Sequence, residues 1–328
     1  MSWRPRALAL TAAALLAAGP TACSDSGSGQ DGKQASRPGF PYTVTNCGVR
    51  TTYEAPPERA VTMNQHVTEI MLALGLEKSL VGTAYLDDSI APAYRKAYER
   101  IPVLAEEYPG KEKLLAADPD FVYGGYSSAF AGRDGRARDD LAKSGIDTRL
   151  NTENCLKGAA GLDDLYREVE QVGRTFGVPD RAEAWNAKAR ATVAAAAKTT
   201  KDARPVSVFV YDSGDKAAFT AGGKGIGNDL ITRAGGRNVF ADLDKSFGDV
   251  SWEQVVDRRP EVVVIYDYGS TTVAQKKKRL LEDPALRDVP AIRNKRFAVM
   301  PLSDTVLGVR VPDALTRLAG QLHPASGR

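Results

Sequence analysis

The sequence predicts an α/β fold in which two Rossmann-like lobes are joined by a long linking helix. Three observations support this fold class. Short apolar segments alternate with segments of helical periodicity in both halves of the chain, a pattern typical of parallel sheets covered by helices. No strand-like segment occurs from Asp163 to Lys201, between the two halves. The chain has 328 residues, more than one hydrophobic core usually supports.

The first lobe is expected over residues 42–160. Its strand-like segments are short and apolar, and they lie at 60–63, 80–84, 120–123 and 146–150. Segments of helical spacing lie between them, at 68–76, 92–100, 112–117 and 139–144. Gly75 and Gly145 end two of these helices, since glycine readily adopts the left-handed conformation found after a helix.

The linking helix is expected over residues 161–203. Apolar residues recur at helical spacing in its first half, at Leu165, Val169, Val172 and Phe176. An alanine-rich run follows and reaches Ala197. Gly177 and Pro179 interrupt the pattern once, so the segment is either a broken helix or one long helix with a step.

The second lobe is expected over residues 204–328, where the alternation resumes. Strands are predicted at 206–211, 262–266 and 296–300, and helices at 228–234, 252–257, 276–281 and 312–322. In two α/β lobes of this kind, a ligand cleft is expected between the lobes, at the carboxyl ends of the strands.

Residues 1–22 are interpreted as a lipoprotein signal peptide. Met1–Arg6 is basic, Ala7–Ala18 is apolar, and small residues precede Cys23. As a helix the apolar stretch covers about 18 Å, well short of a hydrocarbon core of roughly 30 Å. The segment resembles a bacterial lipobox, which implies a diacylglyceryl group on Cys23, although Pro20 stands where leucine is usual. The alternative is an ordinary secretory signal with a chance cysteine.

Residues 23–41 are expected to form a lipid-anchored flexible leash. Ser24–Arg37 consists mainly of Ser, Gly, Asp, Gln and Lys, so it has too few apolar side chains to repay the entropy cost of ordering. As a random coil this run reaches roughly 20 Å. The sequence therefore predicts an extracytoplasmic body that is lipid-anchored to the cell membrane.

The charge and the cysteines narrow the class of protein further. The net charge is +3, and no stretch concentrates Lys and Arg enough to predict a nucleic-acid partner. With Cys23 lipidated, Cys47 and Cys155 remain. Outside the cytoplasm an even pair of cysteines is more often a disulfide than two free thiols, and we expect that bond.

Several segments resemble, in their order along the chain, one known family. They are Pro57–Met63, Thr68–Gly75, Leu80–Gly82, Lys111–Val122, Gly235–Phe240 and Val250–Val256. Over about residues 42–323 they resemble the helix-linked substrate-binding proteins of ABC importers for ferric siderophores, haem and cobalamin. The resemblance implies a monomeric receptor that captures a solute and delivers it to the ABC permease subunits in the membrane.

The sequence is compatible with several ligands and with two roles, transport and sensing. A ferric siderophore is the first expectation, and haem, cobalamin or a related cofactor precursor is the alternative. The runner-up from another class is an extracytoplasmic sensor or scaffold lipoprotein that transports nothing. We expect no cofactor of the protein's own, because iron would enter only as a chelate.

Two glutamates match the family's permease contacts. Glu112 lies in Lys-Glu-Lys-Leu-Leu and Glu253 in Ser-Trp-Glu-Gln-Val. In the family, one glutamate on each lobe pairs with arginines of the permease, and a carboxylate and a guanidinium meet through paired hydrogen bonds. The alternative is a solvated carboxylate that the helix dipole alone favours.

The ligand-binding candidates are the side chains that follow predicted strand ends. They are Asn64, Gln65, His66, Tyr85, Tyr123, Tyr126, Tyr211, Asp212, Tyr266, Tyr268, Ser303 and Arg310. Their aromatic content suits stacking on a flat or apolar ligand. Arg310 suits an anionic siderophore or a ligand that carries a carboxylate.

Other chemistries find little support in the sequence. A free metal ion needs several imidazoles, and the chain has two histidines, His66 and His323. Haem needs only one or two axial ligands, which His66 and Tyr211 would supply. The glycine-rich loop at 222–227 lacks the Gly-Lys-Ser/Thr ending of a phosphate-binding loop and is interpreted as a turn. With no Gly-x-Ser-x-Gly elbow, we expect no enzyme.

Overall fold

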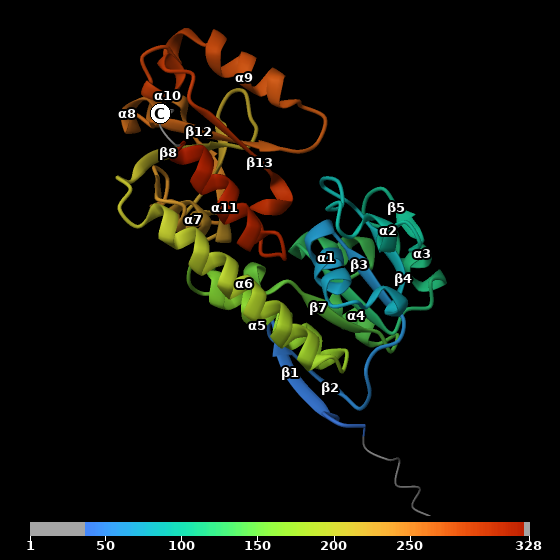
Figure 1. Cartoon of the computed structure of the whole chain (residues 1–328). Coiled ribbons are helices and arrows are strands. Elements are labelled where there is room, and N and C mark those ends of the chain that lie inside the picture. Colours follow the sequence, from blue (N-terminus) through green and yellow to red (C-terminus); the bar gives the residue numbers. More distant parts are fainter. Residues whose placement is uncertain (1–36, 325–328) are drawn as a thin grey trace, which may run out of the picture. The chain divides into compact units, whose positions relative to one another are not determined.

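The computed structural model describes residues 37–324 (Figure 1). The predicted signal peptide, Cys23 and the leash up to residue 36 lie outside the described residues. Within residues 37–324, none of the helices combines the length and the apolar character needed to cross a membrane.

A β-hairpin that the sequence did not predict opens the described chain. Strand β1 (Tyr42–Asn46) pairs antiparallel with β2 (Val49–Tyr53). Cys47 and Gly48 form the turn and both have positive φ, 48° and 84°. Two positive φ values in a two-residue loop match the twist of the flanking strands, which makes this turn type common in hairpins.

The first lobe contains a five-stranded sheet with the order β5-β4-β3-β6-β7, and every pair in it is parallel. Its strands are β3 (Ala60–Met63), β4 (Leu80–Ala84), β5 (Val103–Ala105), β6 (Phe121–Gly124) and β7 (Asp147–Leu150). Its helices are α1 (Gln65–Ala73), α2 (Arg95–Tyr98), α3 (Lys111–Ala116) and α4 (Arg138–Ala142). β3 and β6 are buried along their whole length because they lie inside the sheet.

The linking segment is a broken helix rather than one stepped helix. Helix α5 (Leu162–Thr175) ends before Gly177, whose φ is 68°, and α6 (Pro179–Thr200) begins with a proline at its first position. On α6 the buried residues Ala182, Ala189 and Ala196 recur every seven residues. These small side chains let α6 pack against both α5 and α11 (Val311–Leu322), as Figure 1 shows.

The second lobe contains a parallel sheet with the order β10-β8-β12-β13 and a separate antiparallel pair, β9 and β11. Its strands are β8 (Val206–Tyr211), β9 (Ala218–Ala221), β10 (Gly236–Asn238), β11 (Phe247–Val250), β12 (Val262–Asp267) and β13 (Phe297–Pro301). Besides α11, its helices are α7 (Ile226–Arg233), α8 (Trp252–Arg258), α9 (Val273–Glu282) and α10 (Pro290–Arg293). The two parallel sheets confirm the predicted two-lobed α/β fold.

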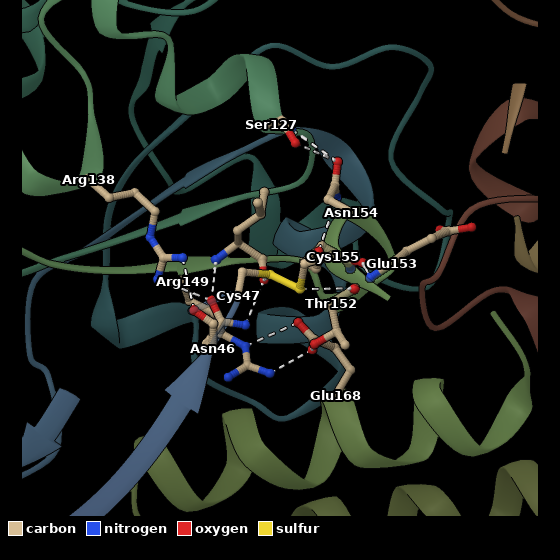
Figure 2. Close-up of a disulfide and its surroundings, with 12 residues drawn as sticks. Asn46, Cys47, Ser127, Arg138, Arg149, Thr152, Glu153, Asn154, Cys155 and Glu168 are labelled. Carbon is tan, nitrogen blue, oxygen red and sulfur yellow. Dashed lines mark hydrogen bonds and ion pairs between the residues drawn. A yellow bond between two sulfur atoms is a disulfide. The ribbon is translucent and has the colours of Figure 1, made fainter. Parts of the chain in front are cut away.

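Cys47 and Cys155 form a disulfide, as the sequence predicted (Figure 2). Their Cα atoms are 5.4 Å apart across a sequence separation of 108 residues. The bond joins the turn of the β1–β2 hairpin to the short turn Thr152–Cys155 that follows β7. It therefore attaches the hairpin covalently to the edge of the first sheet.

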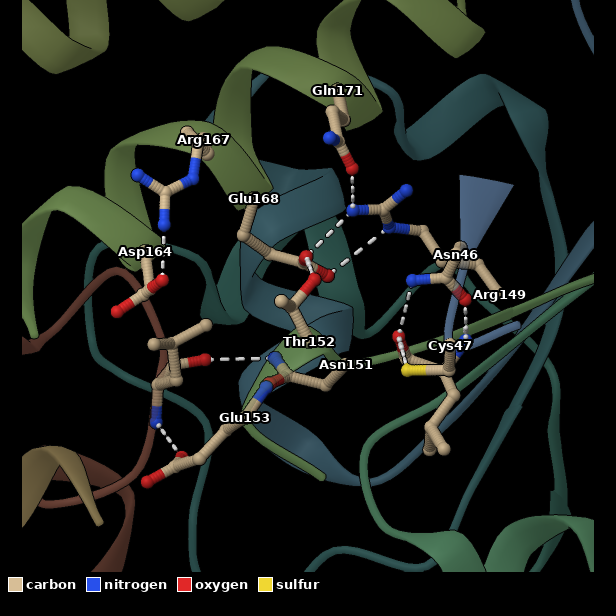
Figure 3. A network of polar contacts seen from close by, with 12 residues as sticks. Asn46, Cys47, Arg149, Asn151, Thr152, Glu153, Asp164, Arg167, Glu168 and Gln171 are labelled. Carbon is tan, nitrogen blue, oxygen red and sulfur yellow. Dashed lines mark hydrogen bonds and ion pairs between the residues drawn. The ribbon is translucent and has the colours of Figure 1, made fainter. Parts of the chain in front are cut away.

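A buried ion pair lies next to this disulfide (Figure 3). Arg149 of β7 donates through Nε and Nη2 to the two carboxylate oxygens of Glu168 on α5, at 3.1 and 2.6 Å. Burial acts to raise the pKa of Glu168, but the Arg149 guanidinium and the hydrogen bonds from Thr152 and Tyr123 together hold that pKa below its ordinary value. The pair fixes the linking helix to the first sheet.

Candidate ligand-binding site

Side chains at the carboxyl ends of both parallel sheets gather in one group, which we call the inter-lobe cluster. It consists of Asn64, Tyr85, Asp87, Tyr108 and Tyr126 from the first lobe and Asp212 and Tyr268 from the second. Burial raises the pKa of Tyr126 well above its usual value, and Asp87, Glu153, Tyr108 and, last, Tyr268 of the other lobe add smaller contributions. A ligand bound between the lobes at the strand ends meets this cluster.

Asn64 is the most unusual residue of the cluster. It joins β3 to α1 with φ 83° and ψ 150°, a conformation found almost only for glycine, which costs about 1–3 kcal/mol. Its side chain is fully buried. The Oδ1 atom accepts a hydrogen bond from the Tyr108 hydroxyl at 2.9 Å, but Nδ2 has no hydrogen-bond partner among the described residues. Strain and an unpaired buried donor together are typical of a site that a ligand completes.

Tyr85, Asp87 and Tyr108 surround Asn64. The rings of Tyr85 and Tyr108 meet edge to face with centroids 4.6 Å apart. Burial raises the pKa of Asp87 to about 6, and the nearby Asn64 amide opposes part of this rise. Tyr108 and Asp87 are not among the predicted ligand contacts, because each lies in a loop three residues after its strand ends.

His66 lies beneath the cluster rather than on its surface. Its ring is buried with a centroid 5.0 Å from that of Tyr126, and its Nε2 atom lies 3.3 Å from the Gly125 carbonyl oxygen. Burial lowers the pKa of His66 to about 4, so the ring is neutral at physiological pH. A Cβ atom on Gly125 would lie 2.4 Å from the His66 ring, so only glycine fits there.

The second lobe contributes Asp212 and Tyr268. The Tyr268 hydroxyl donates to Asp212 Oδ1 at 2.6 Å, and burial raises the pKa of the Asp212 carboxyl. Below them, the buried ammonium of Lys276 donates to the Tyr266 carbonyl oxygen at 2.6 Å. The same ammonium lies 4.9 Å from the centroid of the Tyr268 ring. The ammonium thus fixes the position of the ring from below.

Three predicted ligand contacts are buried in their lobes, and their contact with a ligand stays a prediction. Tyr123 is fully buried and donates to Glu168. Tyr266 is 1% exposed, and Tyr211 packs against Trp252 with centroids 5.6 Å apart. Each tyrosine belongs to its strand instead of following it, and alternate residues of a strand point to opposite faces of the sheet.

Gln65 and Ser303 join the two lobes at the base of the cluster. Gln65 Nε2 donates to Ser303 Oγ, and the Ser303 hydroxyl donates to Asp88 Oδ2 at 3.1 Å. Gln65 Oε1 accepts from the Asp88 backbone amide at 2.9 Å. Because both side chains are buried and bonded to each other, they position the lobes and are not free to bind a ligand.

Arg310 also has protein partners. It lies at the start of α11, and its Nε atom donates to Glu69 Oε2 at 2.7 Å. Asp88 and Asp304 lie 3.8 and 3.9 Å from its Nη1 atom. Three acidic side chains already surround Arg310, so an anionic ligand would compete with them, and ligand contact by Arg310 stays a prediction.

A pocket of about 390 Å³ lies beside Arg310 and is the second place where a ligand would contact both lobes. Among its lining residues are Ala91, Pro92 and Tyr94 from the first lobe and Asp304, Arg310, Asp313 and Arg317 from the second. Tyr94 is the one aromatic residue in this lining, whereas the inter-lobe cluster has four tyrosines. The cluster is therefore the better candidate for an aromatic or apolar ligand.

Glu153 is a structural contact between the lobes that the sequence analysis missed. Its Oε1 atom accepts from the Ile226 amide at 2.7 Å, and its Oε2 atom accepts from the Leu307 amide at 2.8 Å. The first bond caps α7, where a carboxylate is favoured by the helix dipole. Asn151 adds a bond from Nδ2 to the Leu307 carbonyl oxygen at 2.9 Å, as seen in Figure 3.

The two predicted docking residues are exposed, and Glu112 lines a surface pocket that Tyr108 of the cluster also lines. Glu112 lies in the first turn of α3 and Glu253 in the first turn of α8, so each lobe presents one. Neither carboxylate forms an ion pair with another described residue. A hydrogen bond with Ser251 lowers the pKa of Glu253, which keeps it charged. Among the described residues, no group of three or more His, Cys, Asp or Glu side chains is arranged to hold a metal ion.

Solved structures share this fold. The periplasmic binding protein from Veillonella parvula is 31% identical, with a TM-score of 0.80 over 87% of this chain and 98% of that chain. A protein of an ABC-type Fe³⁺-hydroxamate transport system from Saccharomonospora viridis is 28% identical, with a TM-score of 0.74 over 87% of this chain and all of that chain.

Curated proteins of similar sequence are also binding proteins. An uncharacterised ABC transporter substrate-binding lipoprotein of Bacillus subtilis is 24% identical over 96% of each chain. The vitamin B12-binding protein of Vibrio campbellii is 28% identical over 63% of this chain and 70% of its own length. The family described as periplasmic binding protein matches residues 61–303, most of both lobes. The chain therefore belongs to the periplasmic binding protein family, whose members bind a substrate without transforming it.

Proposed function

We propose that this protein is the extracytoplasmic receptor of an ABC importer and that it carries a ferric siderophore to the permease. The relatives support this proposal by their names: one comes from an Fe³⁺-hydroxamate transport system and another is a substrate-binding lipoprotein of an ABC transporter. The observation that carries the ligand site is the unpaired, buried Nδ2 atom of Asn64 among four tyrosines. An amide donor and aromatic faces suit an uncharged, partly apolar chelate.

Native mass spectrometry of the whole chain, purified in detergent, tests the ligand. The chain is screened against ferric hydroxamates, ferric citrate, haemin and cyanocobalamin. Tyr268→Ala is expected to weaken binding at least tenfold, because it removes one aromatic face of the cluster. Tyr94→Ala is the matched control, since that ring lines the other inter-lobe pocket. The cluster is the wrong site if Tyr94→Ala weakens binding and Tyr268→Ala does not.

Cobalamin is the second candidate, and a specific observation favours it. The Vibrio campbellii relative is named for vitamin B12 and is as similar in identity, 28%, as the hydroxamate-system protein. A corrinoid is large and uncharged over most of its surface, as the cluster requires. Binding of cyanocobalamin and of no ferric chelate in the same screen selects this candidate.

Haem receives less support from the geometry. His66 is buried, and its Nε2 atom faces the Gly125 carbonyl oxygen, so axial ligation requires the ring to move. Tyr211, the other predicted axial ligand, donates its hydroxyl to the Gly214 carbonyl oxygen at 3.0 Å. A Soret shift on titration with haemin that disappears in His66→Ala would reverse this judgement.

Docking to the permease is proposed to involve Glu112 and Glu253. Both are exposed, one in each lobe, and neither forms an ion pair with another described residue. Glu112→Lys combined with Glu253→Lys is expected to abolish uptake in cells while leaving ligand affinity unchanged. Glu99→Lys with Asp257→Lys is the matched control, because both are exposed acids of the same lobes. Normal uptake in a deletion strain would instead favour the sensor or scaffold alternative.

Lipid attachment at Cys23 is part of the proposal. The supporting observations are the small-residue segment before Cys23 and the lipoprotein relative from Bacillus subtilis. Incorporation of a clickable fatty acid is expected in the wild-type chain and absent in Cys23→Ser. Labelling that persists in Cys23→Ser places the lipid elsewhere.

A further inference from the structure

The charges around the inter-lobe cluster are predominantly negative. Asp87 is partly buried at its first-lobe side, and Asp212 is buried at its second-lobe side. Glu153 lies below, between the lobes, where it accepts the amides of Ile226 and Leu307. These carboxylates come from both lobes, so a ligand between the lobes meets a negative field from two sides.

Three cations near the cluster are already engaged. Arg136 lies 5.4 Å from the centroid of the Tyr108 ring and pairs with Asp134. Arg310 is surrounded by Glu69, Asp88 and Asp304. The Lys276 ammonium is buried beneath the Tyr268 ring and donates to a carbonyl oxygen. An anionic ligand would therefore have to displace an existing partner to reach any of these three cations.

One donor has no partner within hydrogen-bond distance, although the Asp87 carboxylate is near enough for the Asn64 side chain to lower its pKa. Asn64 Nδ2 is fully buried and has no partner among the described residues. The backbone strain at Asn64 shows that the surrounding structure holds this side chain in place. A neutral amide donor pairs with carbonyl or hydroxamate oxygens without compensating a charge.

From these contacts we propose that the site selects by charge: it takes a neutral or cationic chelate whose oxygens accept from Asn64, and it rejects anionic chelates. Like charges placed together across a binding site are strongly disfavoured. This inference rests on the proposed receptor function and narrows its substrate class. It groups cationic or neutral ferric hydroxamates with corrinoids and separates them from ferric citrate, ferric catecholates and haem carboxylates.

A charge series on one ferric trihydroxamate core tests the proposal. Ferrioxamine B carries a free amine and is cationic, its N-acetyl derivative is neutral, and its N-succinyl derivative is anionic. Calorimetric titration of the whole chain is expected to give similar affinities for the first two. The succinylated form is expected to bind at least tenfold more weakly.

Two substitutions locate the source of the discrimination. Asp87→Asn and Asp212→Asn keep shape and hydrogen-bonding oxygen but remove charge, so each is expected to improve binding of the succinylated form relative to ferrioxamine B. Asp313→Asn is the matched control, because it lines the pocket beside Arg310, and it is expected to leave the ratio unchanged.

The outcomes separate the two claims. Equal affinity for all three derivatives overturns the charge selection and leaves the receptor function standing. If only cyanocobalamin binds, the same comparison is made with its monocarboxylic acid derivative. If neither ferrioxamines nor cyanocobalamin bind, the proposed function fails and the charge selection fails with it.

Discussion

Arg310 Nε donates to Glu69 Oε2 at 2.7 Å, so an arginine of the second lobe is bound by a buried glutamate of the first. The two residues are 241 positions apart in the sequence. Glu69 also accepts from the Ala91 amide at 2.8 Å, which ties the loop after β4 to the same contact. The pair is a structural connection between the lobes.

Removing Arg310 is expected to destabilise the protein strongly. Arg310→Leu leaves the Glu69 carboxylate buried without a cation, a loss of about 3–5 kcal/mol. Urea unfolding followed by circular dichroism measures it. The double variant Glu69→Leu/Arg310→Leu is expected to lose less than Arg310→Leu alone, since it also removes the fully buried Glu69 charge that Arg310 compensates. A smaller loss in Arg310→Leu than in the double variant contradicts this account.

Replacing Asn64 by glycine is expected to stabilise the protein and weaken ligand binding together. Glycine adopts φ 83° and ψ 150° without strain, so after its own entropy cost the gain is about 1 kcal/mol. The Nδ2 donor is lost at the same time. Thermal unfolding and ligand titration measure the two effects. Asn64→Ala is the control, because it loses the donor but keeps the strain, and it is expected not to be stabilised.

Asp87→Asn is expected to change stability in a pH-dependent way. Because burial raises the pKa of Asp87 to about 6, the folded state holds this proton more tightly than the unfolded chain does. The resulting stabilisation is full at low pH and is lost as pH rises through 6. At pH 7 the variant is therefore expected to be more stable than wild type, by up to about 3 kcal/mol. At pH 4 this advantage disappears; an advantage that is the same at both values contradicts the prediction.

Breaking the Cys47–Cys155 bond is expected to cost about 4 kcal/mol, because it closes a loop of 108 residues in the unfolded chain. Cys47→Ala/Cys155→Ala is compared with wild type by urea unfolding. A reductant is expected to lower the stability of wild type to that of the double variant and to leave the double variant unchanged. If the reductant destabilises both proteins equally, its effect does not come from breaking the Cys47–Cys155 bond.

Ligand binding is expected to move the lobes little. Glu153, Gln65 and Arg310 each bond across the lobes, and α6 packs against α11. These contacts resist the wide hinge closure of receptors whose lobes are joined by flexible strands. Small-angle scattering is expected to show the same radius of gyration with and without ligand. A clear contraction would mean that the cross-lobe bonds break on binding.

Much of the fold was predictable because the central strands are apolar throughout. β8 and β12 are buried almost completely, and such runs are recognisable without knowledge of the tertiary structure. The missed strands, β1, β2, β5, β9, β10 and β11, are short and mostly alternate buried with exposed residues. Their pairing depends on partners elsewhere in the chain, which a local pattern does not contain.

The residues of the candidate site could be predicted only where they directly follow a strand in the sequence. Asn64 and Asp212 directly follow β3 and β8, so the rule of strand ends located them. The same rule also selected Tyr123, which the pleat of β6 places in a fully buried position. Tyr108 and Glu153 lie in the segments that follow β5 and β7. The local sequence of such a segment does not predict which residues it will contact in the folded protein. The ion pair of Arg310 with Glu69 could not be predicted either, because the two residues are distant in the sequence.

The hairpin and its disulfide determine how the protein responds to a mechanical pull from the proposed lipid anchor. A force on the chain before Tyr42 acts at the open end of the hairpin, where Tyr42 pairs with Tyr53, so it would peel β1 away one pair at a time. The peeling reaches Cys47 after five residues, about 17 Å of extended chain. There the covalent bond to Cys155 takes up the tension, and the sheets behind it are not pulled apart.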